Sequence, residues 1–297
     1  QQPPLNKPHS LIAGDLPRFR EDALKFFYNV GMTHGPIARV RYLWVYQYVL
    51  THPDYLQYVL QTNNRNYMKE ETLVRAVNMA GESLFSTDGD EWLKRRRLMQ
   101  PAFHKQRLDV FGQMMTEVTA WKMGEWLAAA NQTIELEHEM KDLTMNVIGR
   151  AMLSLDMRQN AHHLHDAFNT TSGFVIKKLQ NPFRAPLFVP TADNRRFIHA
   201  RNTINQTLER VVLERLDTKA VKGDLLDMLL ATMAEEKDGQ IALSRQELLG
   251  ELGGVVFAGH ETTATTLTWL FYLLSQHPNV EAKLHEELDG VLRGRTP

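Results

Sequence analysis

A short polar stretch inside a long apolar segment is the part of this sequence best suited to chemistry. Residues 258–263 read AGHETT, so a small pair, Ala258 and Gly259, precedes an acid, Glu261, and a hydroxyl, Thr262. Glycine costs a helix about 1 kcal/mol relative to alanine, and threonine is a stiff, modest helix former. Residues that break local rules in this way tend to lie at functional sites. The missing side chain at Gly259 lets a flat or small group approach the backbone.

One long helix is expected to carry this stretch. Residues 244–247 read SRQE, which fits a capping box at a helix start. Apolar residues cover nearly every helical face over 248–274, and Pro278 is the next residue that cannot continue a helix. The sequence therefore predicts a helix of roughly 30 residues, on the order of 45 Å long at 1.5 Å per residue.

The long apolar segment also admits other readings. A membrane-spanning helix needs about 20 apolar residues, but Glu251, His260 and Glu261 interrupt this run. A kinked core helix with one satisfied glutamate is a second alternative. A zinc site is a weaker one, because the two-histidine helix signature needs a histidine where Ala264 stands.

A second stretch, DEWLKRRRLMQPAFH, occupies residues 90–104. Trp92 and Arg96 lie four residues apart, so in a helix they share a face. A guanidinium offers a fork to a carboxylate and an indole adds a donor, which suits a planar ligand with two anionic groups. The alternative for such a pair is one core residue and one surface residue.

Residues 258–263 resemble the oxygen-binding signature in the long central helix, the I helix, of the cytochrome P450 superfamily of haem-thiolate monooxygenases. The resemblance implies that Ala258 and Gly259 border the haem. It also implies that the Thr262 hydroxyl takes part in proton delivery to oxygen, and that Glu261 belongs to the same relay.

The pair Trp92 and Arg96 resembles the W-x-x-x-R pattern of that family's C helix, which implies that both residues hold a haem propionate. The family's C helix lies near the face where reductants bind. Lys94, Arg95 and Arg97 are therefore expected to form a docking patch for an acidic electron-donor protein. The alternative for these three residues is a solvated basic face.

The resemblance runs in order along nearly the whole chain and implies a mainly α fold with a small β-sheet. We expect a single, incomplete haem-monooxygenase domain over residues 1–297, which is the N-terminal portion of the cytochrome P450 fold up to the helix after the central one. The residues predict two short strands within 37–49, an irregular connector over 67–90 and a short strand at 132–136. Further helices are predicted at 110–130, 139–155, 193–216, 224–234 and 278–292.

The expected substrate contacts are apolar side chains that the resemblance places around the pocket, although each could instead pack on the core: Leu73, Val77, Phe85, Phe174, Phe257 and Ala258. Segment 181–190, from Asn181 to Pro190, is rich in proline and apolar residues. This composition is typical of a buried loop or of an apolar tip, and the resemblance implies a hydrophobic mouth that could touch a membrane.

Three histidines, His162, His163 and His165, lie in a polar stretch without cysteine or a clear acidic partner. We interpret them as solvated rather than as a metal site.

Composition limits the classes of function. Lys plus Arg number 34 and Asp plus Glu number 35, so the charge balance does not indicate nucleic-acid binding. The chain has no cysteine, which excludes disulfides and a thiolate metal site within these residues. No apolar signal core is found in residues 1–10, so we expect a cytoplasmic protein, while an upstream membrane anchor stays open.

The family's E-x-x-R motif and its iron-ligating cysteine are both missing from these residues. We expect the sequence to be the N-terminal part of a longer protein, with the cysteine ligand downstream and no metal ligand here. By itself this part is expected to be inactive.

For the complete protein, the resemblance implies a monooxygenase that hydroxylates or epoxidises a hydrophobic small molecule with dioxygen. The implied cofactor is haem b (heme, iron protoporphyrin IX), and the two electrons come from NAD(P)H through a reductase or a ferredoxin. A peroxide-driven haem enzyme is one alternative. A haem-free helical protein that binds an apolar ligand is another.

Overall fold

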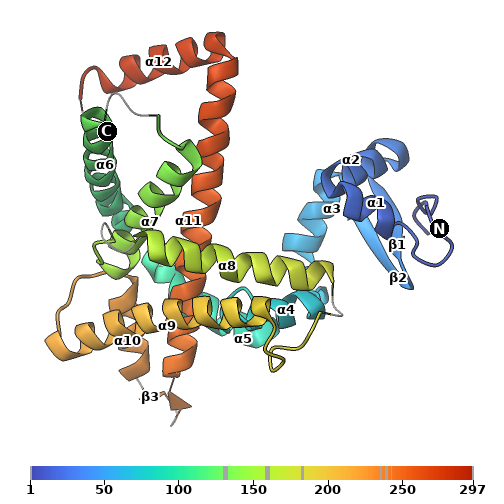
Figure 1. The fold of residues 1–297 in the computed structure, drawn as a ribbon, viewed down its shortest axis with the longest axis horizontal. Coiled ribbons are helices and arrows are strands. Elements are labelled where there is room, and N and C mark those ends of the chain that lie inside the picture. The colour runs from blue at the N-terminus through green and yellow to red at the C-terminus, as the bar shows by residue number, and fades with distance from the viewer. Residues whose placement is uncertain are drawn as a thin grey trace. The chain divides into compact units, whose positions relative to one another are not determined.

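A computed structural model describes residues 2–129, 133–157, 161–181, 184–234, 236–237, 240–241 and 243–295 of the chain. The chain divides into two units, Gln1–Lys69 and Glu70–Pro297, and each contains buried apolar side chains of its own (Figure 1). The prediction of a mainly α fold with a small β-sheet is confirmed.

The first unit packs short helices on a two-stranded sheet. Helices α1 (Leu16–Glu21) and α2 (Ala23–His34) precede strands β1 (Ile37–Tyr42) and β2 (Val45–Leu50), which pair antiparallel with Ile37 opposite Leu50. Its core consists of Phe26, Val30, Ala38 and Val40. Helix α3 (Pro53–Gln57) and single turns at Tyr58–Thr62 and Asn64–Asn66 follow. The two strands predicted within 37–49 are confirmed.

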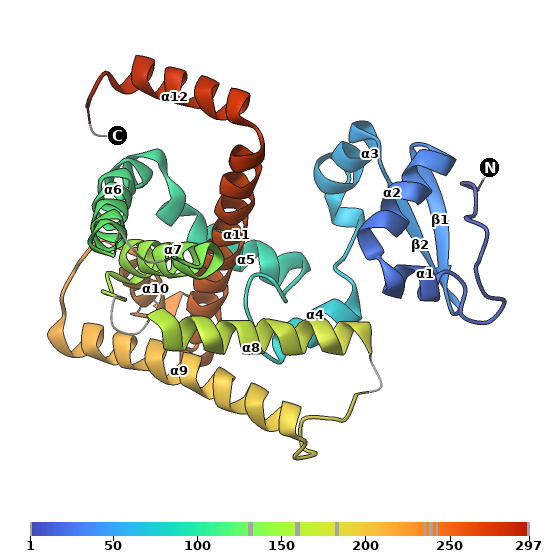
Figure 2. The same cartoon turned by 45° about the horizontal axis from the view of Figure 1, so that its top comes forward.

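The second unit consists mainly of helices that Figures 1 and 2 show gathered around the long helix α11. In chain order they are α4 (Glu71–Asn78), α5 (Gly89–Met99), α6 (Lys105–Ala128), α7 (Leu136–Leu153), α8 (Ala161–Gln180), α9 (Ala192–Thr218), α10 (Leu225–Ala234), α11 (Arg245–Gln276) and α12 (Pro278–Leu292). A 3-10 turn at Gln100–Phe103 follows α5, and strands β3 (Glu236–Lys237) and β4 (Gln240–Ile241) pair before α11. The predicted helices are confirmed, with ends that differ by a few residues.

Helix α11 begins and ends where the sequence predicts. The Glu247 amide donates to Ser244 Oγ at 3.3 Å, and the Ser244 amide donates to Glu247 Oε2 at 2.7 Å, which completes the capping box. At the other end the helix stops at Gln276, two residues before Pro278. Among the described residues, no helix combines the length and the apolar composition that crossing a membrane requires.

Two glycines of α11 allow other segments to reach its backbone. A Cβ atom on Gly259 would lie 2.5 Å from Ile148 Cδ1 of α7, and a Cβ atom on Gly250 would lie 1.9 Å from the Glu82 carbonyl oxygen. Both distances are shorter than van der Waals contact, so a side chain at either glycine would overlap its neighbour. The close-packed interior leaves little space for that neighbour to move. The missing side chain at Gly259 therefore serves helix packing as well as any ligand.

Two local predictions are wrong, and a carboxylate at a helix start explains both. Residues 133–135 are not a strand, since Glu135 is the N-cap of α7 and its carboxylate accepts from the His138 amide at 2.9 Å. Residue 132 lies outside the described residues. The connector over 67–90 contains α4, whose N-cap Glu70 accepts from the first amides of that helix. Accepting from these otherwise unpaired amides favours a helix start.

Replacing Gly250 by alanine is expected to lower the free energy of unfolding by about 1–3 kcal/mol, the usual range for overpacking. The added methyl group meets the Glu82 backbone, which cannot rotate away as a flexible side chain would. Urea unfolding followed by circular dichroism measures this change.

The matched control is Gly173→Ala in α8, because a Cβ there meets no atom within 4 Å. Alanine should stabilise that position by about 0.5–1 kcal/mol. Equal effects of the two substitutions would contradict the close approach at Gly250.

Candidate functional site

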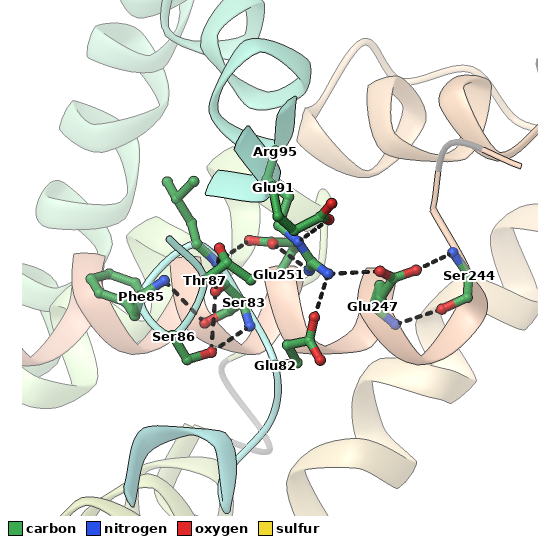
Figure 3. Close-up of polar contacts among 11 residues, drawn as sticks. Glu82, Ser83, Phe85, Ser86, Thr87, Glu91, Arg95, Ser244, Glu247 and Glu251 are labelled. Atoms are coloured by element: carbon green, nitrogen blue, oxygen red, sulfur yellow. Dashed lines mark hydrogen bonds and ion pairs between the residues drawn. The ribbon is translucent and has the colours of Figure 1, made fainter. Parts of the chain in front are cut away.

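Arg95 of α5 is buried, with 1% of its side chain exposed, and carboxylates surround it (Figure 3). Its Nη1 donates to Glu251 Oε1 at 3.0 Å, and its Nε donates to Glu91 Oε1 at 2.9 Å. Its Nη2 donates to Glu82 Oε1 and to Glu247 Oε1, both at 2.6 Å. We call these five residues the Arg95 cluster.

The Arg95 cluster ties α5 and the loop before it to α11. The second oxygen of Glu251, Oε2, accepts from the Leu84 amide at 3.0 Å, so this buried carboxylate holds the loop as well as the guanidinium. Burial raises the pKa of Glu251, while the Leu84 amide and Arg95 oppose that rise. Because several carboxylates share one cation, the relative positions of α5 and α11 are closely constrained.

This placement corrects the interpretation of the basic run in α5. Arg95 belongs neither to a solvated face nor to a docking patch, whereas Lys94 and Arg97 are exposed. The sequence contains one local signal for the ion pair, because Glu91 lies four residues before Arg95. The acids on α11 could not be paired with Arg95 from sequence spacing.

Arg96 and the small residues of α11 line one cavity of about 470 Å3. The apolar part of its wall consists of Leu84, Phe85, Met99, Phe103, Ile148, Met152, Val255, Ala258 and Gly259. The Arg96 guanidinium lies 5.3 Å from the centre of the Trp92 ring, so the two side chains share a face of α5. Within the described part of the chain, no carboxylate lies at ion-pair distance from Arg96.

The residues of this cavity are suited to contact one face and one edge of a haem. Apolar side chains and Gly259 offer a surface for a flat apolar ring, and an unpaired guanidinium at the wall suits a carboxylate. The axial thiolate cannot come from these residues, because the chain has no cysteine.

Thr262 and Glu261 occupy different environments although they are adjacent. Thr262 is exposed, and its Oγ1 donates to the Ala258 carbonyl at 2.6 Å. The Glu261 side chain is 30% exposed, and its Oε1 lies 4.0 Å from Lys141 Nζ of α7. Within the described residues, its Oε2 is buried without a hydrogen-bond partner. Thr262 is therefore linked to Ala258, which lines the cavity of Arg96, but is not itself one of the described lining residues, and Glu261 lies near α7.

A second cavity, of about 310 Å3, is apolar and is lined by residues of α4, α8, α9 and α11. Leu73, Val77, Phe85 and Phe257 line it, as candidate substrate contacts would. Sequence reasoning missed other apolar lining residues, which the helical period of α8 and α9 could have indicated: Phe168, Val175, Ile176, Leu179 and Ile204. Phe85 lines both cavities and so lies between them.

Phe174 does not line either cavity as the structure describes them. Its ring stacks on Phe197 of α9, with 4.2 Å between ring centres, and it is buried. Phe174 therefore contributes to packing between α8 and α9. Ala258 lines the cavity that Arg96 also lines and does not line the second cavity.

His165 and His260 form a buried pair that the sequence did not predict. The interpretation of His165 as solvated is wrong, since it is 4% exposed, whereas His163 is exposed and the side chain of His162 lies outside the described residues. His165 Nδ1 lies 3.1 Å from His260 Nε2, and Asn169 Nδ2 lies 2.8 Å from His165 Nε2. Burial lowers the pKa of both histidines, that of His260 to about 3, so both rings are neutral at neutral pH.

The loop before α9 presents an apolar side chain to solvent. Asn194 Nδ2 donates to the carbonyls of Pro186 at 2.7 Å and Val189 at 2.8 Å, which holds the loop to the start of α9. Phe188 is 86% exposed. Residues 182 and 183 lie outside the described residues, and the hydrophobic mouth proposed for 181–190 stays a prediction.

Comparison with known proteins identifies similar sequences along most of the chain. The family model described as Cytochrome P450 matches residues 3–297. Cyclooctatin synthase of Streptomyces melanosporofaciens is 33% identical over 276 residues, which cover 89% of this chain and 57% of that protein. Pentalenene oxygenase of Streptomyces avermitilis is 30% identical over 266 residues, with 89% and 58% covered. Leukotriene-B4 omega-hydroxylase 3 of Mus musculus is 25% identical over 270 residues, with 84% and 51% covered. The chain spans between 51% and 58% of these relatives' lengths.

Replacing Arg95 by methionine is expected to lower the free energy of unfolding by about 3–5 kcal/mol, the cost of breaking a buried ion pair on one side. The substitution leaves Glu251 buried without its cation. Urea unfolding of the two proteins measures the difference.

Arg75→Met is the control, because Arg75 pairs with Glu71 through side chains that are each 76% exposed. Removing an exposed pair should change stability little. Similar losses in both variants would contradict a special role for the Arg95 cluster.

Proposed function

The chain belongs to the cytochrome P450 family, and from this premise we propose that the complete protein is a haem-dependent monooxygenase. It inserts one oxygen atom from dioxygen into a hydrophobic small molecule, by hydroxylation or epoxidation, with two electrons from a redox partner. The observation that carries the proposal is that Arg96, Ala258 and Gly259 line one cavity although α5 and α11 lie far apart in the sequence.

Haem, when bound, supplies the activation of dioxygen. In the proposed assignment, Arg96 and Trp92 hold its propionates, and Ala258 and Gly259 lie against its ring. The guanidinium offers paired donors to a carboxylate, and the Trp92 ring beneath it limits where the guanidinium can move. The protein's own contribution is to orient the ring, to exclude water and to deliver protons.

Proton delivery is assigned to Thr262 and Glu261. The Thr262 hydroxyl hydrogen is already donated to the Ala258 carbonyl, so its oxygen is free to accept a hydrogen bond from a water molecule. A water molecule bound there would lie on the side of α11 that carries Ala258, which lines the cavity. Glu261 is assigned to the same relay because it is the acid next to Thr262 in the sequence, and its carboxylate lies toward Lys141 of α7.

The proposed substrate is apolar and binds in the second cavity. Small-molecule sites have volumes of about 300–1,000 Å3 and mainly apolar walls, and this cavity of about 310 Å3 meets both conditions. Relatives named for pentalenene and for leukotriene B4 support a hydrophobic substrate, although they do not specify one. Phe85 lines both cavities, so it would contact the substrate where the second cavity meets the haem cavity and would influence the substrate's orientation toward the haem.

Electrons are proposed to arrive from an acidic donor protein that docks at Lys94 and Arg97. Both side chains are exposed on α5, which also carries the proposed propionate ligands. Arg95 is excluded from this patch because it is buried in its cluster.

Replacing Thr262 by alanine is expected to uncouple turnover. Reduced cofactor should still be consumed, but peroxide should be released and product formation should fall by at least about tenfold, within the range of a lost acid–base contribution. Product, peroxide and cofactor consumption are measured together in the complete protein with its redox partner.

Thr266→Ala is the matched control, because Thr266 Oγ1 donates to the Thr262 carbonyl at 2.8 Å in the same way, one turn further along α11. The control should stay coupled. Full coupling in Thr262→Ala would refute the relay assignment.

Charge reversal at Arg97 is expected to slow reduction by the donor protein several-fold at low salt, and the difference should shrink as ionic strength rises. Substrate affinity should not change. Stopped-flow reduction across a salt series measures the effect.

Lys283→Glu on α12 provides an exposed charge reversal elsewhere in the chain. It should leave the reduction rate and its salt dependence unchanged. If Arg97→Glu behaved like this control, the docking patch would have to lie on another surface.

A further inference from the structure

Two buried histidines and a carboxylate meet where α8 contacts α11, on the side of α11 that packs against α7. We propose that His165, His260 and Glu261 form a binding site for a single zinc ion. The site shares Glu261 with the proposed proton relay, but the zinc-binding test does not depend on the proposed monooxygenase function.

The three ligand atoms already lie close to the geometry that zinc requires. They all lie within 4.8 Å of one another. A tetrahedral zinc ion with bonds of about 2.0–2.1 Å places its ligands roughly 3.3 Å apart. His165 Nδ1 and His260 Nε2 are 3.1 Å apart, so the nitrogen pair needs little movement. Glu261 Oε2 is 4.0 Å from His260 Nε2 and must approach by about 0.7 Å.

The ligand atoms are available to a metal. His165 Nδ1 and His260 Nε2 share the proton of one hydrogen bond, which has to move to an outer ring nitrogen before zinc binds both inner nitrogens. His260 Nδ1 has no hydrogen-bond partner among the described residues and can carry a proton. Glu261 Oε2 is buried and, within the described residues, accepts no hydrogen bond. The Glu261 side chain remains 30% exposed, which leaves it room to move and provides a route for the ion.

The surrounding charges favour a cation. Lys141 Nζ lies 4.0 Å from Glu261 Oε1, but the same lysine donates to Glu137. Asp142 and Asp166 add negative charge near His165. Lys122 Nζ lies 3.8 Å from Asp142 Oδ2, so two lysines face the four carboxylates of Glu137, Asp142, Asp166 and Glu261. A divalent ion would reduce this imbalance.

The ligand set also selects the type of ion. Two imidazoles and one carboxylate suit zinc, whereas magnesium and calcium prefer oxygen ligands. Asn169 Nδ2 lies 2.8 Å from the outer nitrogen of His165. Rotation of this amide by about 180° would bring its oxygen to the same place, where it accepts the proton that the outer nitrogen carries when the inner nitrogen binds the ion. The fourth position is left for water, as in zinc sites with three protein ligands.

Zinc binding is tested on the complete protein after treatment with a chelator and dialysis. Isothermal titration with Zn2+, together with the metal content after dialysis, gives affinity and stoichiometry. We expect one zinc per chain that His165→Gln and Glu261→Gln each weaken more than about tenfold, since even outer-shell changes cost about 10–100-fold. Excess Mg2+ should not displace it.

His163→Gln is the matched control, because His163 is exposed two residues away on the same helix. It should bind zinc as the unaltered protein does. Zinc should raise the melting temperature of the unaltered protein and of this control, but not of the two ligand variants, which are also checked for folding by circular dichroism.

No zinc uptake by the unaltered protein, or equal affinity in all four proteins, would overturn the proposal. None of these measurements requires turnover or a redox partner. Failure of the monooxygenase assignment and failure of the zinc site can therefore be told apart.

Discussion

A single guanidinium, shielded from water, holds the working parts of the second unit together. Arg95 has donors in a planar fork, and each of its three nitrogens donates to at least one carboxylate. An ion pair in this setting contributes little net stability, because desolvation opposes it, but leaving one partner alone is costly. The cluster therefore acts mainly as a constraint on geometry. Since Arg96 is the next residue of the same helix, fixing Arg95 against α11 also fixes where Arg96 meets the cavity that Ala258 and Gly259 line.

Helix α11 can serve as a shared wall only because parts of its surface carry no side chain. Gly250 admits the Glu82 backbone and Gly259 admits Ile148, so both neighbours contact the helix directly. Each glycine costs helix stability of about 1 kcal/mol relative to alanine, and burial of apolar side chains along α7 offsets this. The same close approach brings the loop that carries Phe85 against α11, where its ring lines both cavities.

Features written in local sequence could be predicted, whereas those that join distant segments could not. The capping box at Ser244 and the stop before Pro278 are local, and both ends of α11 agree with the prediction. The shared face of Trp92 and Arg96 follows from helical spacing. The burial of Arg95 and of His165 does not, because Glu251 and His260, their buried partners, lie on α11, more than 90 residues along the chain. From sequence alone, every residue of a basic or polar run is predicted to be exposed, and only the fold shows that Arg95 and His165 are buried.

The position of Glu261 shows how one residue can belong to two environments. Successive helical residues are turned by about 100°, so Glu261 and Thr262 cannot point the same way. Thr262 lies one turn beyond Ala258 and shares its side of the helix, while Glu261 faces Lys141 and His260. Because burial lowers the pKa of His260 to about 3, that ring offers the carboxylate no positive charge at neutral pH. Glu261 is thus left with one distant cation and an unpartnered oxygen, so its charge is only partly balanced within the described residues. A carboxylate oxygen without a partner beside two buried histidines is suited to bind a metal ion, and its fit to that ion depends on how closely His260 and His165 approach it.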